Sequence, residues 1–337
     1  MRRSAPAPRH ARSRGQRGAA LLAAMLTVML VATFSAAALW QQWRASEVEA
    51  AERGRVQAAW VLIGALDWSR LILREDGMTG GPDHLAEPWA VPLAEARLTS
   101  FLSAEKNVAS DSLEGLPDAF LSGRIVDAQS KLNVLSLVDG NKPVPASVAT
   151  FTKLFNILGL PASELAVMTS SLLRAMAAPA DASGGGGGSD GAGAPLMPQE
   201  VSQLVWLGLS PSTVAALEPY VTVLPIRTPL NINTASAEAI SASLPSLSIS
   251  DARQVVEKRT RAFFRQIADA SQALPNGGSQ FNANQHSVST QFFEVHGRLR
   301  IDRTWVEERS LLQRNGITVK TVWRHRGAGL VAPPAKP

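Results

Sequence analysis

The chain has 337 residues, a formal net charge of +5 and no cysteine. This length allows one large or two modest domains, and the lack of cysteine excludes disulfides, thiolate metal sites and cysteine nucleophiles. The positive charge invites a nucleic-acid interpretation, but +5 less six leader arginines leaves −1 for the remainder; these are Arg2, Arg3, Arg9, Arg12, Arg14 and Arg17. The basic character therefore belongs to the amino-terminal leader.

This basic leader meets an apolar run at Gly18. The run from Ala19 to Trp40 covers 22 residues without an ionisable side chain, and about 20 apolar residues suffice to cross a bilayer as a helix. Because the leader is rich in arginine and contains no acidic residue, the positive-inside tendency should keep it in the cytoplasm and place the rest of the chain on the other side.

Three interpretations of this junction stay open. An ordinary secretory signal would be cut near Ser35-Ala-Ala-Ala38, whereas a plain anchor would not be cut at all. A type IV prepilin leader ends in glycine and is cut on the cytoplasmic side, here between Gly18 and Ala19, which leaves the apolar helix in the mature chain with Ala19 as its methylated first residue. We favour the prepilin interpretation because it alone explains the glycine.

The helical pattern continues beyond the apolar run. Residues 41–73 contain no proline and place an amphipathic stripe one turn apart at Val56, Trp60, Ile63 and Leu66. We therefore expect one continuous helix from residue 19 to 73, about 80 Å long at roughly 1.5 Å per residue. Its outer half should pack under a sheet, and the breaker-rich residues 76–82 should form a loop.

Strand patterns lie on both sides of a helical region. Residues 123–134 predict the first strand of a sheet with a polar turn at 127–131, which Ile125 and Val126 precede and Leu132 and Val134 follow. Residues 287–325 predict three antiparallel strands with reversals at Asp302-Arg303 and Asn315-Gly316. Between them the apolar period is helical: Phe151, Leu154, Phe155 and Leu158 precede a stop at Gly159. The predicted fold class is α+β, with a pilin-like long N-terminal helix, transmembrane in its first half, packed on an antiparallel sheet and carrying a large all-helical insertion domain.

The predicted domain order follows from these patterns. We expect a prepilin leader at 1–18, a transmembrane helix at 19–40, the first part of a pilin-like domain at 41–142, a helical insertion domain at 143–274, the C-terminal strands at 275–326 and a flexible tail at 327–337. Within the insertion, the glycine run at 184–188 predicts a disordered loop over 181–194.

Several separate segments together resemble one known family, the minor pseudopilin K of bacterial type II secretion systems. The segments are Arg17-Gly-Ala19, Leu71-Ile-Leu-Arg-Glu-Asp-Gly77, Asp83-His-Leu-Ala-Glu-Pro-Trp-Ala90, Ser122-Gly-Arg-Ile-Val-Asp-Ala-Gln-Ser-Lys-Leu-Asn-Val134, Leu230-Asn-Ile-Asn-Thr-Ala235 and Val322-Trp-Arg-His325. The resemblance extends nearly from end to end.

This resemblance implies a subunit at the tip of the pseudopilus that helps initiate its assembly and the export of folded proteins across the outer membrane. The implied partners are minor pseudopilins I and J, the other pseudopilus subunits and the prepilin peptidase. The chain would cross the inner membrane once, with its bulk in the periplasm. Most pilin-like subunits carry Glu at the fifth mature position, which here is Ala23; an unpaired carboxylate in the membrane is costly, so alanine fits a subunit with nothing stacked above it.

Members of the resembled family can hold structural calcium, which prefers oxygen ligands. The candidates are Glu75, Asp76, Asp83 and Glu87, although no EF-hand spacing is present and we commit to no metal or other cofactor. The chain has no HExxH, no G-x-S-x-G and no phosphate-binding loop. We therefore expect neither an enzyme nor a small-molecule substrate.

A rival function rests on residues 230–261, which also resemble a helix-hairpin-helix module that binds DNA phosphates. In this interpretation Thr234 caps the first helix, Asp251 opens the second, and four cations follow: Arg253, Lys258, Arg259 and Arg261. However, Ser246-Leu-Ser248 stands where glycines would let backbone amides approach a phosphate. A membrane-anchored DNA receptor is therefore the alternative function, and we expect no nucleic-acid partner.

Overall fold

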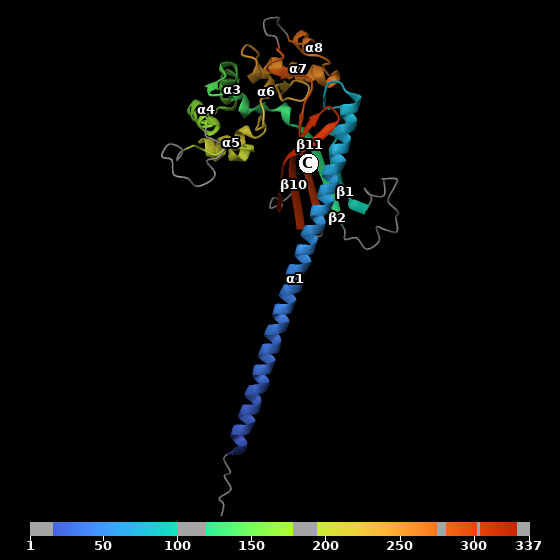
Figure 1. The fold of residues 1–337 in the computed structure, drawn as a ribbon, viewed down its shortest axis with the longest axis vertical. Helices are drawn as coiled ribbons and strands as arrows, with labels where there is room; N and C mark the ends of the chain where they lie inside the picture. The colour runs from blue at the N-terminus through green and yellow to red at the C-terminus, as the bar shows by residue number, and fades with distance from the viewer. Residues whose placement is uncertain (1–15, 100–118, 178–193, 275–280, 302–303, 329–337) are drawn as a thin grey trace, which may run out of the picture. The chain divides into compact units, whose positions relative to one another are not determined.

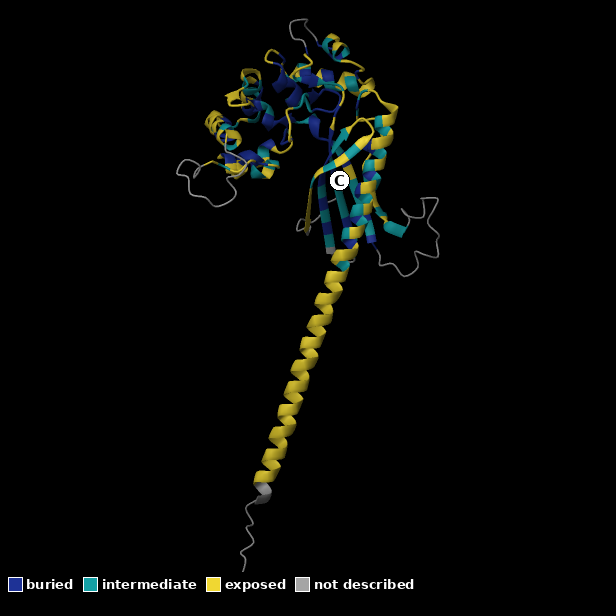
Figure 2. Ribbon diagram, in the orientation of Figure 1, coloured by how far each residue is buried: buried dark blue, intermediate teal, exposed yellow. Residues whose placement is uncertain are grey.

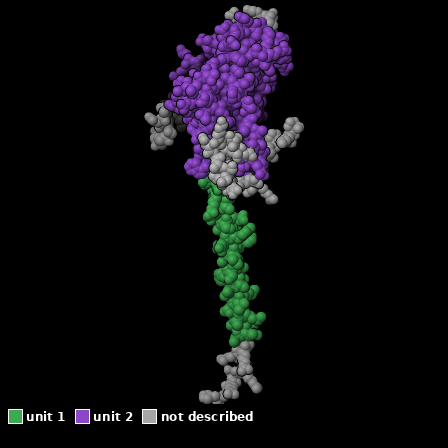
Figure 3. All heavy atoms as spheres, turned by 90° about the vertical axis from the view of Figure 1, so that its right-hand side faces the viewer, with its two compact units in different colours: residues 1–59 green, residues 60–337 purple. Residues whose placement is uncertain are grey.

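A computed structural model describes residues 16–99, 119–177, 194–274, 281–301 and 304–328 (Figure 1). The chain divides into two compact units, residues 1–59 and residues 60–337 (Figure 3). The predicted leader at 1–18 lies almost entirely outside the described residues. The predicted loop at 181–194 also lies outside them, apart from Ala194.

Helix α1 (Gln16–Thr79) is one continuous element of 64 residues. In the first unit every residue from 19 to 53 is exposed, including the whole apolar run (Figure 2). By length and composition, this helix can cross a membrane. It ends six residues later than the predicted Leu73, so Asp76 and Gly77 belong to its last turn and not to a loop as expected.

A five-stranded antiparallel sheet lies in the second unit. Its strands are β1 (Leu93–Arg97), β2 (Ala119–Asp127), β9 (Phe292–Ile301), β10 (Thr304–Asn315) and β11 (Thr318–Ala328), in that spatial order. The three predicted C-terminal strands are confirmed, as is the reversal at Asn315-Gly316, where Gly316 has φ +58°. The predicted reversal at Asp302-Arg303 lies outside the described residues.

The prediction for residues 123–134 is confirmed only in part. Ile125 and Val126 lie on β2, which begins at Ala119 and ends at Asp127, and the predicted polar turn contains η3 (Ala128–Ser130). Leu132 does not return to this sheet, because it belongs to β3 (Leu132–Asn133), which pairs elsewhere. The strand that comes first along the chain is β1, which lies at the edge of the sheet. Its sequence, Leu-Ala-Glu-Ala-Arg, does not favour strands, so pairing with β2 determines its conformation.

The face of α1 that packs on the sheet matches the predicted stripe only in part. Leu66 of that stripe is buried and Ile63 is half-buried, whereas Val56 and Trp60 are exposed. Leu62 and Leu73, which lie outside the stripe, are buried as well. Leu66 and Leu73 share a core with sheet and loop residues Trp89, Ile125, Phe293, Val295 and Leu312. Because α1 carries more than one apolar stripe, the sequence period did not reveal which one faces the sheet.

The helices that lie between β2 and β9 in sequence group together beyond one end of the sheet (Figure 1). They are α3 (Pro145–Leu158), α4 (Ala162–Ala177), η6 (Val201–Leu207), α5 (Pro211–Leu217), α6 (Ala237–Ser243), α7 (Ile249–Arg261) and α8 (Ile267–Gln272). The predicted stop is confirmed, since Gly159 ends α3 with φ +67°. These helices surround one apolar core that extends in sequence from Leu132 to Phe281.

The structure also describes short elements in the second unit. They are η1 (Pro88–Ala90), η4 (Val134–Leu137), β4 (Val138–Asp139), β5 (Lys142–Pro143), β6 (Val221–Thr222), β7 (Leu230–Asn231) and β8 (His286–Ser287). Strand β3 pairs with β6, and β7 pairs with β8. The region between β2 and β9 is therefore mostly helical but contains short strands as well.

Candidate functional site

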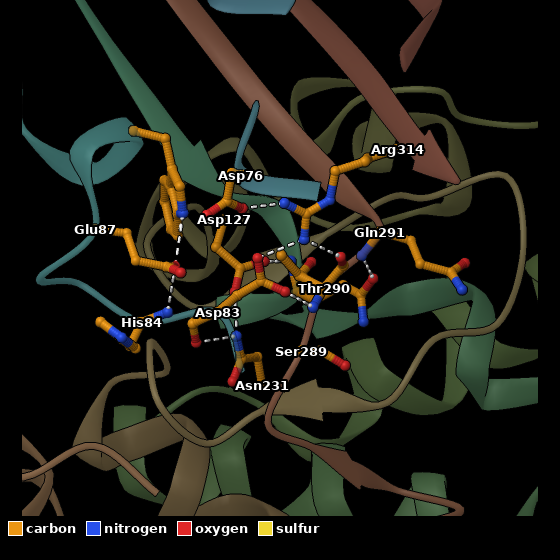
Figure 4. Close-up of polar contacts among 12 residues, drawn as sticks. Asp76, Asp83, His84, Glu87, Asp127, Asn231, Ser289, Thr290, Gln291 and Arg314 are labelled. Atoms are coloured by element: carbon orange, nitrogen blue, oxygen red, sulfur yellow. Dashed lines mark hydrogen bonds and ion pairs between the residues drawn. The ribbon is translucent and has the colours of Figure 1, made fainter. Parts of the chain in front are cut away.

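Three carboxylates lie close together where the end of α1, the loop after it and the hairpin of β10 and β11, here called the last hairpin, meet. Oxygen atoms of Asp76, Asp83 and Glu87 all lie within 4.8 Å of one another. With Arg314 they form what we call the carboxylate–arginine cluster (Figure 4). The fourth predicted candidate, Glu75, is exposed and does not belong to the cluster, because adjacent residues on a helix point about 100° apart.

Arg314 lies on β10, one residue before that strand ends, and its side chain is only 10% exposed. One terminal nitrogen, Nη1, binds Asp76 Oδ2, and the other, Nη2, binds Asp83 Oδ1. Nη2 also donates to the carbonyl oxygen of Thr290 at 3.2 Å, and the guanidinium lies 4.8 Å from the centre of the Phe293 ring. Both terminal nitrogens of the guanidinium are therefore engaged within the protein.

The remaining carboxylate oxygens are partly satisfied by N–H groups. Asp83 Oδ2 accepts from the backbone N–H of Thr290 at 2.7 Å, and Glu87 Oε2 accepts from the backbone of His84 and the indole of Trp89, both at 2.8 Å. Burial nevertheless raises the pKa of Asp83 to about 6 and the pKa of Glu87 to about 7. Asp83 and Glu87 therefore hold their protons at a higher pH than isolated carboxyl groups would.

A second buried carboxylate, Asp127 at the end of β2, binds the insertion to the sheet. Its Oδ2 accepts from Asn231 Nδ2 at 2.8 Å and from Thr234 Oγ1 at 2.5 Å, while Oδ1 accepts from the Gln129 N–H at 2.7 Å. Asn231 also donates to the carbonyl oxygen of Asp83 at 3.2 Å. Three of the segments that carry the sequence resemblance therefore meet here.

The contact at Thr234 corrects one expectation. Thr234 does not cap a helix, because α6 begins at Ala237, three residues later; its hydroxyl group instead donates to Asp127. The cap of α6 is Ser236, whose Oγ accepts from the Ala239 N–H at 3.1 Å. Both residues are of types that cap helices, and the start of α6 at Ala237 decides between them.

The expectation of calcium can be judged from these donors. The oxygen chemistry suits calcium, which binds six to eight oxygens. However, Arg314 already binds Asp76 and Asp83, and Glu87 Oε2 receives two N–H groups. As arranged, the cluster does not fit a calcium ion, because the guanidinium takes up the carboxylate oxygens that the ion would need.

The last turn of α1 touches the turn between β10 and β11 directly. A Cβ atom added at Gly77 would lie 2.5 Å from the carbonyl oxygen of Gly316. Glycine at position 77 therefore lets the helix come close enough for Asp76 to reach Arg314, because no side chain at 77 collides with the backbone of Gly316.

We expect Gly77→Ala to lower the free energy of unfolding by about 1–3 kcal/mol, because the added methyl overpacks against backbone. Gly64→Ala is the matched control on the same helix, since a Cβ there meets nothing within 4 Å. That control should instead stabilise the protein by about 0.5–1 kcal/mol. Denaturant unfolding of both variants would check this, and equal effects would contradict the close-packing argument.

Several cationic side chains in and around the helix-hairpin-helix-like segment bind backbone carbonyl groups of the protein itself. Lys153 of α3 donates to the carbonyl oxygens of Leu244, Pro245 and Leu247 in the hairpin at 2.7, 3.2 and 2.6 Å. Lys258 donates to the Ala273 carbonyl at 2.6 Å, and Arg259 to the Ile232 carbonyl at 2.5 Å.

Two of the four cations that the rival DNA-binding interpretation would use, Lys258 and Arg259, are thus engaged in holding the fold. Arg253 and Arg261 are exposed. At the start of α7, Ser248 is the cap and Asp251 lies in the first turn, two residues after the helix begins at Ile249. A carboxylate in this turn disfavours a phosphate at the same helix end.

A buried serine–histidine pair also proves to be structural. His286 Nε2 lies 3.0 Å from Ser243 Oγ, and its Nδ1 lies 3.2 Å from both the N–H and the carbonyl oxygen of Asn282. Ser243 directs its own hydrogen to the Ile240 carbonyl at 2.8 Å, so in this arrangement its oxygen is free to accept from Nε2. The hydrogen bonds of both side chains thus join parts of the fold, and burial lowers the pKa of His286 to about 4.

The fold and the cluster together define a class of protein. A long helix, apolar at its start and packed at its end on an antiparallel sheet, with a helical insertion between two neighbouring strands, is the architecture of a pilin-like subunit. Two family models match the insertion, at residues 130–226 and 230–289, and both are described as type II secretion system protein K. The chain belongs to this family, the minor pseudopilin K of type II secretion.

Curated relatives agree over almost the whole chain. The type II secretion system protein K of Pseudomonas aeruginosa is 28% identical over 327 residues, covering 92% of this chain and 90% of the relative. The proteins of the same name from Pectobacterium carotovorum and Klebsiella pneumoniae are 27% and 25% identical, and cover 93% and 94% of this chain and 97% and 98% of their own.

The fold also resembles a solved structure. One chain in the crystal structure of the GspK–GspI–GspJ complex from the type 2 secretion system of enterotoxigenic Escherichia coli matches with a TM-score of 0.60 and 18% identity. The match covers 82% of this chain and 98% of that chain. At this identity the match concerns the fold alone.

Proposed function

We propose that this minor pseudopilin stands at the tip of the type II secretion pseudopilus, where it helps initiate assembly and thereby supports the export of folded proteins across the outer membrane. The observation that carries the proposal is the helical insertion between β2 and β9 of a pilin-like sheet. A subunit inside a fibre needs free faces toward both neighbours, and a large addition at one end of the sheet favours a terminal position.

The first part of α1 supports anchoring in the inner membrane. Its apolar residues from 19 to 39 are exposed throughout, as expected for a segment whose surroundings are lipid or other helices. Ala36, Ala37 and Ala38 offer small side chains that allow close approach of a neighbouring helix. The fifth mature position is Ala23, so no carboxylate there needs a partner in the membrane.

The partners proposed for this helix are minor pseudopilins I and J. The similar Escherichia coli structure is by its title a complex of GspK with GspI and GspJ. Side-by-side packing of the three amino-terminal helices would begin the fibre, and the periplasm would hold the rest of the chain. The alternative role as a DNA receptor has less support, because Lys153, Lys258 and Arg259 bind internal carbonyl groups.

The mature amino terminus tests this route to the fibre. We expect mass spectrometry of the chain isolated from membranes to find residues 1–18 removed and Ala19 methylated, because a prepilin peptidase cuts on the cytoplasmic side. An intact leader would indicate a plain anchor. A chain that begins near Leu39 would indicate a secretory signal, and either result would contradict assembly through a retained helix.

A further inference from the structure

We infer that Arg314 is the built-in cation of the carboxylate–arginine cluster, so that this site works without calcium and would take up calcium only if the guanidinium were removed. The inference does not depend on the proposed function. It concerns how the end of α1, the following loop and the last hairpin are held together.

The spacing of the carboxylates suits either kind of cation. Calcium binds oxygens at 2.3–2.6 Å, so two ligands on opposite sides of the ion lie about 5 Å apart. The oxygens of Asp76, Asp83 and Glu87 lie within 4.8 Å of one another. The two terminal nitrogens of Arg314 bind one oxygen each of Asp76 and Asp83. An ion and the guanidinium would therefore compete for the same oxygens.

Burial and charge decide this competition in favour of the arginine. The Arg314 side chain is 10% exposed and those of Asp76 and Asp83 are 13% and 2% exposed. A divalent ion that entered beside the guanidinium would be repelled by it at short range, because charges on largely buried side chains are screened less than charges in bulk water. Without the guanidinium, three carboxylates would face one another with no positive partner, which is the situation that a hard cation relieves.

The contacts of Arg314 also connect the parts of the chain that a structural ion would connect. Asp76 and Asp83 lie 238 and 231 residues before it in sequence, and Thr290 lies 24 residues before it. One side chain thus joins the end of α1, the loop after it and the segment that leads from the insertion into β9.

The test compares thermal unfolding of the full chain, purified in detergent, in a calcium chelator and in millimolar calcium, with magnesium as the ion control. The wild-type unfolding temperature should be the same in all media. Arg314→Gln should unfold at a lower temperature in chelator and regain several degrees in calcium but not in magnesium. Arg314→Lys keeps a positive charge and should show no gain from calcium.

Arg309→Gln is the matched control, because Arg309 also pairs with a carboxylate, Glu294, but lies elsewhere on the sheet. It should respond to calcium no more than the wild type does. A wild-type unfolding temperature that rises with calcium, and no longer does so in Asp83→Asn, would overturn the inference. So would an Arg314→Gln variant that is equally unstable, or equally unable to fold, with and without calcium.

Discussion

Replacing residues 131–288 with a short glycine-serine loop is expected to lengthen pseudopili and to reduce secretion strongly. Under the proposed tip position, the insertion blocks the addition of a further subunit on the outward side. Its removal should therefore leave a subunit that joins the fibre without ending it. The measurements are pseudopilus length by electron microscopy and the amount of an exported protein outside the cell.

The sheet allows this replacement without disrupting its pairing. Strands β2 and β9 are antiparallel neighbours, with Asp127 opposite Phe293, so a short hairpin can join them. A simple deletion of the predicted insertion, 143–274, would be a poorer test. It would leave behind apolar residues of the same core that lie outside those bounds, such as Leu132, Val134 and Phe281.

The control is the same chain with an unrelated helical bundle of similar size in place of the short loop. If the insertion acts by its bulk, the bundle should restore the normal length of the pseudopilus. Unchanged length and secretion in the short-loop variant, with the variant still incorporated into membranes, would rule out the blocking role. Restored length without restored secretion would show that the insertion has a second task in export.

Asp127→Ala is expected to lower the free energy of unfolding by about 2–4 kcal/mol, because it leaves buried hydrogen-bond donors without a partner. The donors are the side chains of Asn231 and Thr234 and the backbone N–H of Gln129. The hydrogen bonds that are lost lie at the junction between the sheet and the insertion. Denaturant unfolding and limited proteolysis would both report it, with early cleavage expected within the insertion.

Two further variants separate this junction from a general effect of losing a carboxylate. Asp139→Ala removes an ion pair with Arg227. Because the Asp139 side chain is 71% exposed, this change should lower the free energy of unfolding by no more than about 1 kcal/mol. Asp127→Asn keeps one acceptor oxygen and should lose less stability than Asp127→Ala. If Asp127→Ala and Asp139→Ala were equally stable, Asp127 would not be the link between insertion and sheet.

The sequence located several features of the candidate site but not how they are connected. Asp76, Asp83 and Glu87 were identifiable as acidic residues near a loop, and Asp127 and Asn231 lay within the resembling segments. Arg314 was not among the candidates, since it lies more than 200 residues away from its partners Asp76 and Asp83. A signal was present in retrospect, because Arg314 immediately precedes the Asn-Gly turn that brings the last hairpin back against α1.

The sequence by itself determined the long helix and the helical region between two groups of strands, because both depend on local periodicity. It also determined the Asn315-Gly316 hairpin from turn chemistry, and the family from motifs that occur in a fixed order. Only the tertiary structure decided which stripe of α1 faces the sheet, that β1 is a strand, that Ser236 and not Thr234 caps α6, and that an arginine lies among the candidate metal ligands. Each of these outcomes depends on a partner distant in sequence. Local propensity and spacing carry no information about such partners, and packing and burial select among alternatives that are locally equivalent.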